Sequence, residues 1–229
     1  MNDPTSQLPS GPRAEETGDW QVSLAEIDAM GRKAARGAGY SWGMAEEAGR
    51  AARWLSAYGL PGPEALLAVL TATDGAVAQH APRIGETSWR CEAGVLCPIA
   101  AGAALSDRAH GIAAGVDFAL GPVLLPLLVV PFLSRAARDL DCMIMMEGPG
   151  LRLVASTEGP AAADWDALNV ARSGALLVAR TAGPVHEPLR AGPEARTLPV
   201  ALWRAMDGFA QRTYAPATEA SRRAGAGPA

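Results

Sequence analysis

Apolar residues recur at helical spacing in three successive segments of the N-terminal third. In the first segment, Ser23 and Glu26 have the spacing of a capping box, which satisfies free backbone N–H groups at a helix start. The second segment begins at Ser41 and ends at Gly59, and Pro63 suits the first turn of a third. The pattern predicts helices over residues 23–37, 41–58 and 63–70, within a helical subregion that spans 22–73.

Shorter apolar runs follow residue 73, and several of them are compatible with strands. The prolines of the run 122–140 are expected to bend one long buried helix, and residues 183–198 to form a proline-rich loop. The remaining predicted elements are strands at 87–92 and 94–97, a helix at 98–109, a hairpin of 142–146 with 151–155, a strand at 174–179 and a helix at 199–210. The strand at 174–179 is too apolar for an exposed edge.

These elements predict an α+β fold, with a helical N-terminal third followed by a small mixed or antiparallel sheet packed with helices. Residues 1–19 are polar and lack periodicity, so we expect a disordered tail. Residues 20–229 are expected to form a single domain, whose α+β body covers residues 84–215.

Composition and charge exclude several classes of protein. The net charge of −4 argues against general nucleic-acid binding, which requires a basic surface. The apolar run 118–133 is too short for a membrane span and is interrupted by prolines, so we expect a buried element and no membrane partner. The N-terminus lacks the basic start and apolar segment of a signal peptide, which favours a cytoplasmic protein.

The three cysteines, Cys91, Cys97 and Cys142, lack metal-binding spacing. We expect buried or half-buried free thiols, and we expect His80, His110 and His186 to be surface or loop residues. No motif indicates a metal or an organic cofactor.

The first segment with candidate chemistry is 32–48, where glycines turn the chain between two helices. Arg36, Tyr40 and Trp42 lie at this turn, beside the free N–H groups of the second helix start. Such N–H groups can hold a carboxylate or phosphate. The alternative is a tight helix–helix turn with a packing tryptophan.

The second segment, 209–227, is dense in polar side chains. Tyr214 or Glu219 could transfer a proton if burial shifts its pKa, and the arginines could hold an anion. The other candidate binding residues here are Arg212, Thr213, Thr218, Ser221 and Arg222. The alternative is a short terminal helix, capped at Thr218, whose charges face water.

The stretches 22–27 and 33–48, together with 209–227, resemble the bacterial family known as domain of unknown function 3726. The resemblance spans the chain from about Val22 to its end, and the family name implies no activity. The opening helical pair is also similar to the N-terminus of the type-2 malate/lactate dehydrogenases. The Ser-His-Gly segment of those enzymes has no match after Gly59, so we do not assign the chain to them.

Two functions from different classes follow. The first is a small-molecule enzyme or binding protein for an anionic metabolite, whose pocket is formed by the 32–47 and 209–227 segments. The second is a non-catalytic subunit, in a homo-oligomer or with a partner subunit, that binds another protein through an apolar surface.

Overall fold

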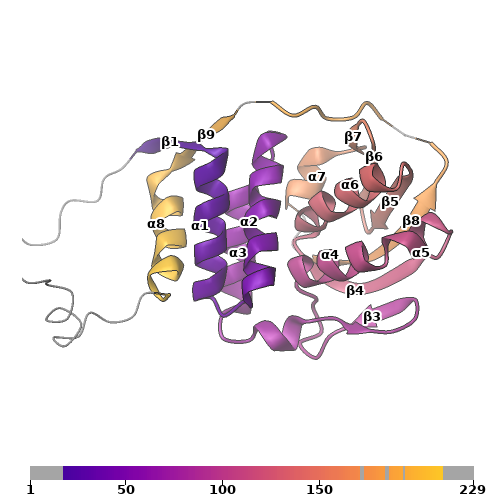
Figure 1. The fold of residues 1–229 in the computed structure, drawn as a ribbon, viewed down its shortest axis with the longest axis horizontal. Coiled ribbons are helices and arrows are strands. Elements are labelled where there is room, and N and C mark those ends of the chain that lie inside the picture. Colours follow the sequence, from indigo (N-terminus) through magenta and orange to yellow (C-terminus); the bar gives the residue numbers. More distant parts are fainter. Residues whose placement is uncertain (1–17, 171–172, 184–185, 193, 214–229) are drawn as a thin grey trace, which may run out of the picture.

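A layer of helices lies on one side of the molecule, beside a sheet with its own helices (Figure 1). The computed structural model describes residues 18–170, 173–183, 186–192 and 194–213. The helices of this layer are α1 (Leu24–Gly37), α2 (Trp42–Ala57), α3 (Gly62–Thr73) and α8 (Val200–Gln211). The three predicted N-terminal helices and the final helix are therefore confirmed.

The predicted capping box at the start of α1 is present. The backbone N–H of Ser23 donates to the Glu26 carboxylate at 2.9 Å, and the N–H of Glu26 donates to the Ser23 hydroxyl at 3.2 Å. At the start of α2, the N–H of Met44 donates to the Ser41 hydroxyl at 3.4 Å. Both helices thus begin where the sequence places a side-chain acceptor.

Small residues let the helices of this layer approach one another closely. A Cβ atom on Gly37 of α1 would lie 1.7 Å from the carbonyl oxygen of Phe209 in α8. A Cβ on Gly62 of α3 would lie 2.1 Å from the carbonyl oxygen of Ala52 in α2. Both distances are far below van der Waals contact, so the backbones themselves touch at these crossings.

A two-stranded antiparallel ribbon joins the first and last described parts of the chain. It pairs β1 (Asp19–Ser23) with β9 (Ala195–Pro199), with Trp20 opposite Leu198. The prediction of a loop throughout 183–198 is wrong over 195–198. Leu198 is fully buried, and Val22 on the facing strand is also buried, so the ribbon has an apolar side against the helices.

The main sheet has seven strands in the order β2-β3-β4-β8-β5-β6-β7. Only the β3–β4 pair is parallel among the paired strands, so the sheet is mixed and the α+β fold class is confirmed for the described part of the chain. Its strands are β2 (Arg83–Ile84), β3 (Ser88–Arg90), β4 (Phe118–Leu124), β5 (Met143–Gly148), β6 (Leu151–Ser156), β7 (Gly159–Ala162) and β8 (Ser173–Thr181). The predicted hairpin is β5–β6, and the predicted apolar strand is the interior strand β8.

The prediction of one long helix over 122–140 is wrong. The start of this run belongs to β4, and a 3-10 turn η2 (Pro126–Val129) precedes the helix α6 (Val130–Asp139). Leu125 separates strand from turn with a left-handed φ of 46°. A continuous apolar run does not distinguish a buried strand from a buried helix, and Pro126 and Pro131 lie in first turns, where proline is tolerated.

Two weaker predictions also change. The predicted strand 94–97 is reduced to a single bridge between Leu96 and Val123. The predicted helix 98–109 is divided into α4 (Pro98–Asp107) and α5 (Ala109–Ala113). The remaining short elements are η1 (Val77–His80) and α7 (Trp165–Val170).

Helices cover one face of the main sheet. α6 packs on β5, β6 and β7, and α4 packs on β4. Ile144, Met146 and Leu153 on this side are fully buried. On the opposite face, Leu177 in the middle of β8 is 38% exposed, so this part of the sheet is uncovered in the described structure.

No helix in the described ranges combines the length and apolarity needed to cross a bilayer. Of the predicted disordered segment 1–19, only residues 18–19 fall within the described structure, and Asp19 begins β1.

Candidate functional site

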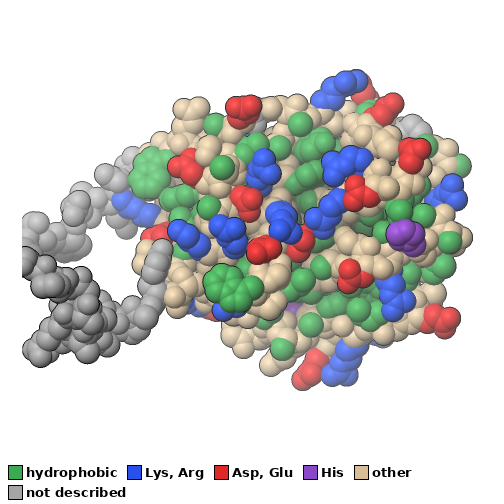
Figure 2. Space-filling view, in the orientation of Figure 1, with side chains coloured by type: hydrophobic (Ala, Val, Ile, Leu, Met, Phe, Trp, Pro, Cys, Tyr) green, Lys and Arg blue, Asp and Glu red, His purple; other side chains and the backbone are tan. Residues whose placement is uncertain are grey.

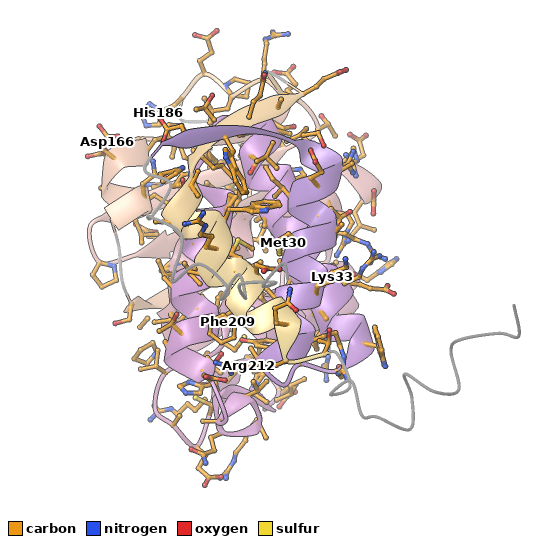
Figure 3. The ribbon with its side chains drawn as sticks, turned by 90° about the vertical axis from the view of Figure 1, so that its left-hand side faces the viewer. Met30, Lys33, Asp166, His186, Phe209 and Arg212 are labelled. Carbon is orange, nitrogen blue, oxygen red and sulfur yellow. The ribbon has the colours of Figure 1, made fainter. Side chains whose placement is uncertain are left out.

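The two segments with candidate chemistry lie side by side in their described parts. The end of α1 contacts the end of α8 through the backbone crossing of Gly37 and Phe209. Figure 3 shows Phe209 and Arg212 at the end of α8, next to α1 with Met30 and Lys33. We call residues 32–42 with 209–213 the terminal corner.

Arg36 and Trp42 form a stacked pair at the surface of this corner. The Arg36 guanidinium carbon lies 4.5 Å from the centroid of the Trp42 ring, and Arg36 also donates to the backbone oxygen of Tyr40. Trp42 is 69% exposed. The guanidinium therefore binds protein groups on two sides while the ring presents a surface to solvent.

Tyr40 lies in the interior of the corner and is 1% exposed. Its hydroxyl is 2.8 Å from the Thr73 hydroxyl and 3.3 Å from the Cys97 sulfur. Burial is the main cause that raises the pKa of Tyr40 above its usual range, and burial likewise raises the pKa of the Cys97 thiol. Both groups stay protonated at neutral pH and form part of the packed interior.

Arg212 and Thr213 also have protein partners. Arg212 donates to both carboxylate oxygens of Asp74, at 2.7 and 2.9 Å, and its guanidinium lies 4.4 Å from the Phe209 ring centroid. The Thr213 hydroxyl donates to the Ala210 carbonyl at 2.7 Å. The substrate-binding roles of the described residues remain predictions. The other predicted site residues, Tyr214, Thr218, Glu219, Ser221 and Arg222, lie outside the described residues.

A cavity of about 360 Å³ lies at the end of the sheet where β5 begins and β8 ends. Strand register explains its floor: Met143 of β5 is opposite Thr181 of β8, and Val154 of β6 is opposite Ala161 of β7. These side chains share one face because alternate residues of a strand point the same way. We call this hollow the Cys142 cavity, after the residue that precedes β5.

The loop after β8 lies over part of this cavity through Pro188. The N–H of Leu189 donates to the Pro160 carbonyl at 2.8 Å and holds the loop against β7. A Cβ on Gly159 would lie 2.4 Å from the Leu189 carbonyl oxygen, and Gly159 has a φ of +133°. A glycine is therefore required where the loop meets the strand.

The rim of the Cys142 cavity carries charges of both signs. Asp141 precedes Cys142, Glu158 lies in the turn between β6 and β7, and Arg180 lies near the end of β8. The Ser156 hydroxyl donates to the Gly159 carbonyl at 2.9 Å and accepts from the Glu158 N–H at 3.3 Å, which fixes that turn. Arg180 donates to the Ala113 carbonyl at 3.0 Å, which leaves its other N–H groups for a ligand.

The Cys142 thiol lies between these charges. Burial raises the pKa of Cys142, the positive charge of Arg180 opposes this effect, and the negative charge of Asp141 adds to it. The thiol is therefore protonated at neutral pH, whereas a nucleophilic cysteine requires a thiolate. Cys91 and Cys142 are half-buried, Cys97 is buried and all three are free, as the sequence predicts.

Sequence reasoning missed this cavity, because it predicts only a strand of a hairpin for the run 142–146. The lining residues come from four separate parts of the chain, and none stands in a local motif. The apolar, β-compatible runs predict the strands β5, β6 and β8, but they do not predict the hollow at the ends of these strands.

A second hollow, of about 440 Å³, lies beside β3 and β4 and is bordered by Arg90 and Cys91. Its floor consists mainly of small residues, including Gly121 and Ala175. Over the helices α1, α2 and α6, basic and acidic side chains are intermixed (Figure 2). No group of three or more His, Cys, Asp or Glu side chains suited to a metal ion occurs among the described residues.

Comparison with known proteins gives a family match for the N-terminal part of the chain but no activity. No curated protein sequence matches the chain. The crystal structure of malate dehydrogenase from Entamoeba histolytica is similar with a TM-score of 0.42 and 11% identity, over 60% of this chain and 44% of that one. The chain thus spans less than half of that enzyme, and a likeness this distant assigns neither fold nor function.

The family match covers α1, α2 and α3 and ends just after β3, so the similarity expected for residues 209–227 lies outside it. The resemblance of the N-terminal segments is confirmed. Residues 22–95 of this chain match the family described as "Protein of unknown function (DUF3726)".

Proposed function

We propose that this protein binds a small metabolite with an anionic group, and that the Cys142 cavity holds it. The observation that supports this proposal is that Arg180 is among the residues that line a 360 Å³ hollow and has no ion-pair partner among the described residues. Small-molecule sites have volumes of about 300 to 1,000 Å³. A guanidinium binds a carboxylate or phosphate through parallel hydrogen bonds. Thr157 and Thr181 add hydroxyl donors to the same hollow.

The terminal corner supports the proposal less well in its described part. Its two arginines already bind protein groups, Arg36 at Tyr40 and Trp42, and Arg212 at Asp74. An incoming anion would have to compete with the Asp74 carboxylate for Arg212. The sequence-based proposal of a pocket formed by 32–47 and 209–227 remains an alternative location for the same ligand class.

The proposal concerns binding rather than a reaction. The Cys142 thiol is protonated at neutral pH, because burial raises its pKa. The hydroxyls, carboxylates and guanidinium of the cavity suffice to orient a polar ligand. Proton transfer by Tyr214 or Glu219 stays a prediction for residues beyond the described structure.

The test is an NMR titration of the full chain labelled at its methionine methyl groups. Met143 lies in the cavity floor, whereas Met206 is buried in α8 and reports any global change. Met143→Leu assigns the cavity signal. Propionate, succinate and inorganic phosphate serve as probes. We expect at least one probe to shift the Met143 signal and leave Met206 unchanged.

Variants then locate the site. Arg180→Gln should weaken binding about tenfold or more, because a charge-assisted hydrogen bond is lost. Arg36→Gln, Arg212→Gln and Arg90→Gln should leave affinity unchanged. Loss of binding in Arg36→Gln or Arg212→Gln alone would move the site to the terminal corner, and loss in Arg90→Gln alone would move it to the second hollow. If no probe shifts Met143, the proposal is wrong.

A second candidate function is binding of another protein subunit through the uncovered face of the sheet. Leu177 of β8 lies opposite Ala119 of β4 on this face, and Ala175 is also exposed. An antiparallel sheet normally presents polar side chains to water, so exposed apolar residues favour an interface. Sedimentation of the wild type and of Leu177→Lys tests self-association. A wild type that remains a monomer at high concentration excludes the homo-oligomer.

A further inference from the structure

Two carboxylates, those of Asp141 and Glu158, line the same cavity as Arg180. Among the described residues, neither carboxylate forms a hydrogen bond or ion pair through its side chain, and Arg180 bonds only the Ala113 carbonyl. The opposite charges thus border a shared volume without contacting each other. A rim of this type is complementary to a ligand that carries both signs of charge.

The backbone at Asp141 gives an independent reason to assign a role to its side chain. Asp141 follows Leu140, the residue that caps the end of α6, and has a left-handed φ of 45°. The Asp141 N–H donates to the Arg138 carbonyl at 3.4 Å and the Cys142 N–H to the Ala137 carbonyl at 3.0 Å. This is the hydrogen-bond pattern of a helix end at which glycine is the usual residue.

A side chain at this position is therefore strained relative to glycine. Aspartate tolerates the left-handed region better than most residues, but the helix end itself gains nothing from a carboxylate, because a helix C-terminus favours positive charge. The carboxylate is thus placed against both backbone preference and the helix dipole. Strain of this kind is a reason to look for a binding role.

From this rim we infer that the ligand carries an ammonium group in addition to its anionic group, and that Asp141 binds the ammonium while Arg180 binds the anion. The inference rests on the proposed function. The ligand class is an amino acid or another aminocarboxylate. A purely anionic ligand would meet two carboxylates and one guanidinium, a net charge of −1 from these three groups. An added ammonium offsets that repulsion.

Cys142 is compatible with this arrangement. Its sulfur lies close enough to Asp141 and Arg180 for both charges to affect it, and a protonated thiol contributes no charge of its own. The apolar floor of Met143, Val154 and Ala161 suits the short carbon chain between the two charged groups.

The experiment compares matched pairs of probes that differ only in the amino group. The pairs are alanine and β-alanine against propionate, 4-aminobutyrate against butyrate, and 5-aminovalerate against valerate. The different chain lengths sample the separation of the two charges. Binding to the full-length protein is followed through the Met143 methyl signal. At least one amino compound should bind about tenfold more tightly than its matched carboxylate.

Asp141→Asn tests the ammonium site at Asp141 separately from the anion site at Arg180. Asparagine also tolerates the left-handed backbone, so the variant removes the charge and keeps the local conformation. This variant should lose the preference for the amino compound and keep or improve the affinity for the carboxylate. Glu147→Gln, an exposed position elsewhere on β5, is the matched control and should change neither affinity.

The outcomes distinguish this inference from the proposed function. If the carboxylates bind through Arg180 and the amino group adds nothing, the ammonium site is wrong and the anion site stands. If the preference for the amino compound survives in Asp141→Asn, the role of Asp141 is wrong. If no member of any pair shifts Met143, both proposals fail.

Discussion

The polar side chains of the four-helix layer and those at the end of the seven-stranded sheet differ in whether they have protein partners. In the layer, the polar residues of the terminal corner bind neighbouring side chains or the backbone, as in the contacts of Arg36 with the Tyr40 carbonyl and of Arg212 with the Asp74 carboxylate. At the end of the sheet, Asp141, Glu158 and Arg180 border one cavity without pairing among the described residues. Polar density along a sequence therefore locates a structural corner here, whereas unpaired charges around a hollow locate the better candidate site.

The same contrast holds for packing. The layer joins its helices by backbone contact at Gly37 and Gly62, and it has little room for added atoms. The sheet has one covered face and one face on which Leu177 is exposed. Substitutions in the layer should therefore mainly change stability, and substitutions at the sheet end should mainly change binding.

The largest effect is expected at the α1–α8 crossing. Gly37→Ala should lower the free energy of unfolding by about 3 kcal/mol or more, because its Cβ would overlap the Phe209 carbonyl and the backbones must separate. Gly43→Ala in α2 is the matched control, since nothing lies within 4 Å of its Cβ position, and it should stabilise by up to about 1 kcal/mol. Urea unfolding measures both. Equal effects would contradict backbone contact at the crossing.

Alkaline pH should weaken the helical layer. Because burial raises the pKa of Cys97, the native state retains a proton that the unfolded chain releases above about pH 8.5. Stability from this group is complete below that pH and is lost as pH rises, at up to about 1.4 kcal/mol per pH unit. Burial also raises the pKa of Tyr40, so its contribution to stability is likewise lost as pH rises above the unfolded pKa of about 10.

Urea unfolding of the wild type and of Cys97→Ala between about pH 7 and pH 9.5 checks this prediction. The variant should be less stable at neutral pH, because it loses the contact with Tyr40, but its stability should fall less with pH. Identical slopes for the two proteins would show that Cys97 is not the group responsible.

At the sheet end, Asp141→Gly should raise the free energy of unfolding by about 1 kcal/mol, because glycine adopts the left-handed backbone without strain. Asp139→Gly, two residues earlier at the last position of α6, should lower it instead. Thermal unfolding distinguishes the two signs. A loss of stability in Asp141→Gly would mean that its side chain contributes to the fold rather than to a ligand.

The smallest effect is expected at the exposed face of the terminal corner. Trp42→Ala should cost about 0.5 to 1 kcal/mol, because the ring is mostly exposed and its described ring contact is the stacked Arg36. The same substitution at Trp89, which is fully buried against Phe118, should lower the free energy of unfolding by about 3 to 5 kcal/mol. A large loss at Trp42 would show that the corner is packed more tightly than its exposure indicates.

The helical third was predictable because its signals are local. Ser23 with Glu26, Ser41 and Pro63 specify helix starts within one turn of the chain. The region 118–140 was not, because its apolar side chains suit either a strand or a helix. The choice was made by strand pairing with β8, more than fifty residues later along the chain (Phe118 pairs with Val178).

The Cys142 cavity was beyond sequence reasoning for the same reason. Asp141, Glu158 and Arg180 become neighbours only after β5, β6 and β8 align, and each alone resembles an ordinary surface charge. The 32–42 and 209–213 segments were expected to be adjacent, and they are. Their side chains were not expected to bind other protein groups, as Arg212 does with the Asp74 carboxylate.

The position of α8 also bears on how the chain folds during synthesis. α1 leaves the ribosome before the sheet segment does, but one of the helices that pack along it, α8, is formed by residues 200–211. Until those residues emerge, one flank of α1 has no neighbour and the first strand of the β1–β9 ribbon has no partner. The sheet is translated in this interval, so the layer can be completed only after the sheet segment is made. Such a long-range closure predicts slow folding of the layer and exposure of apolar surface on the nascent chain.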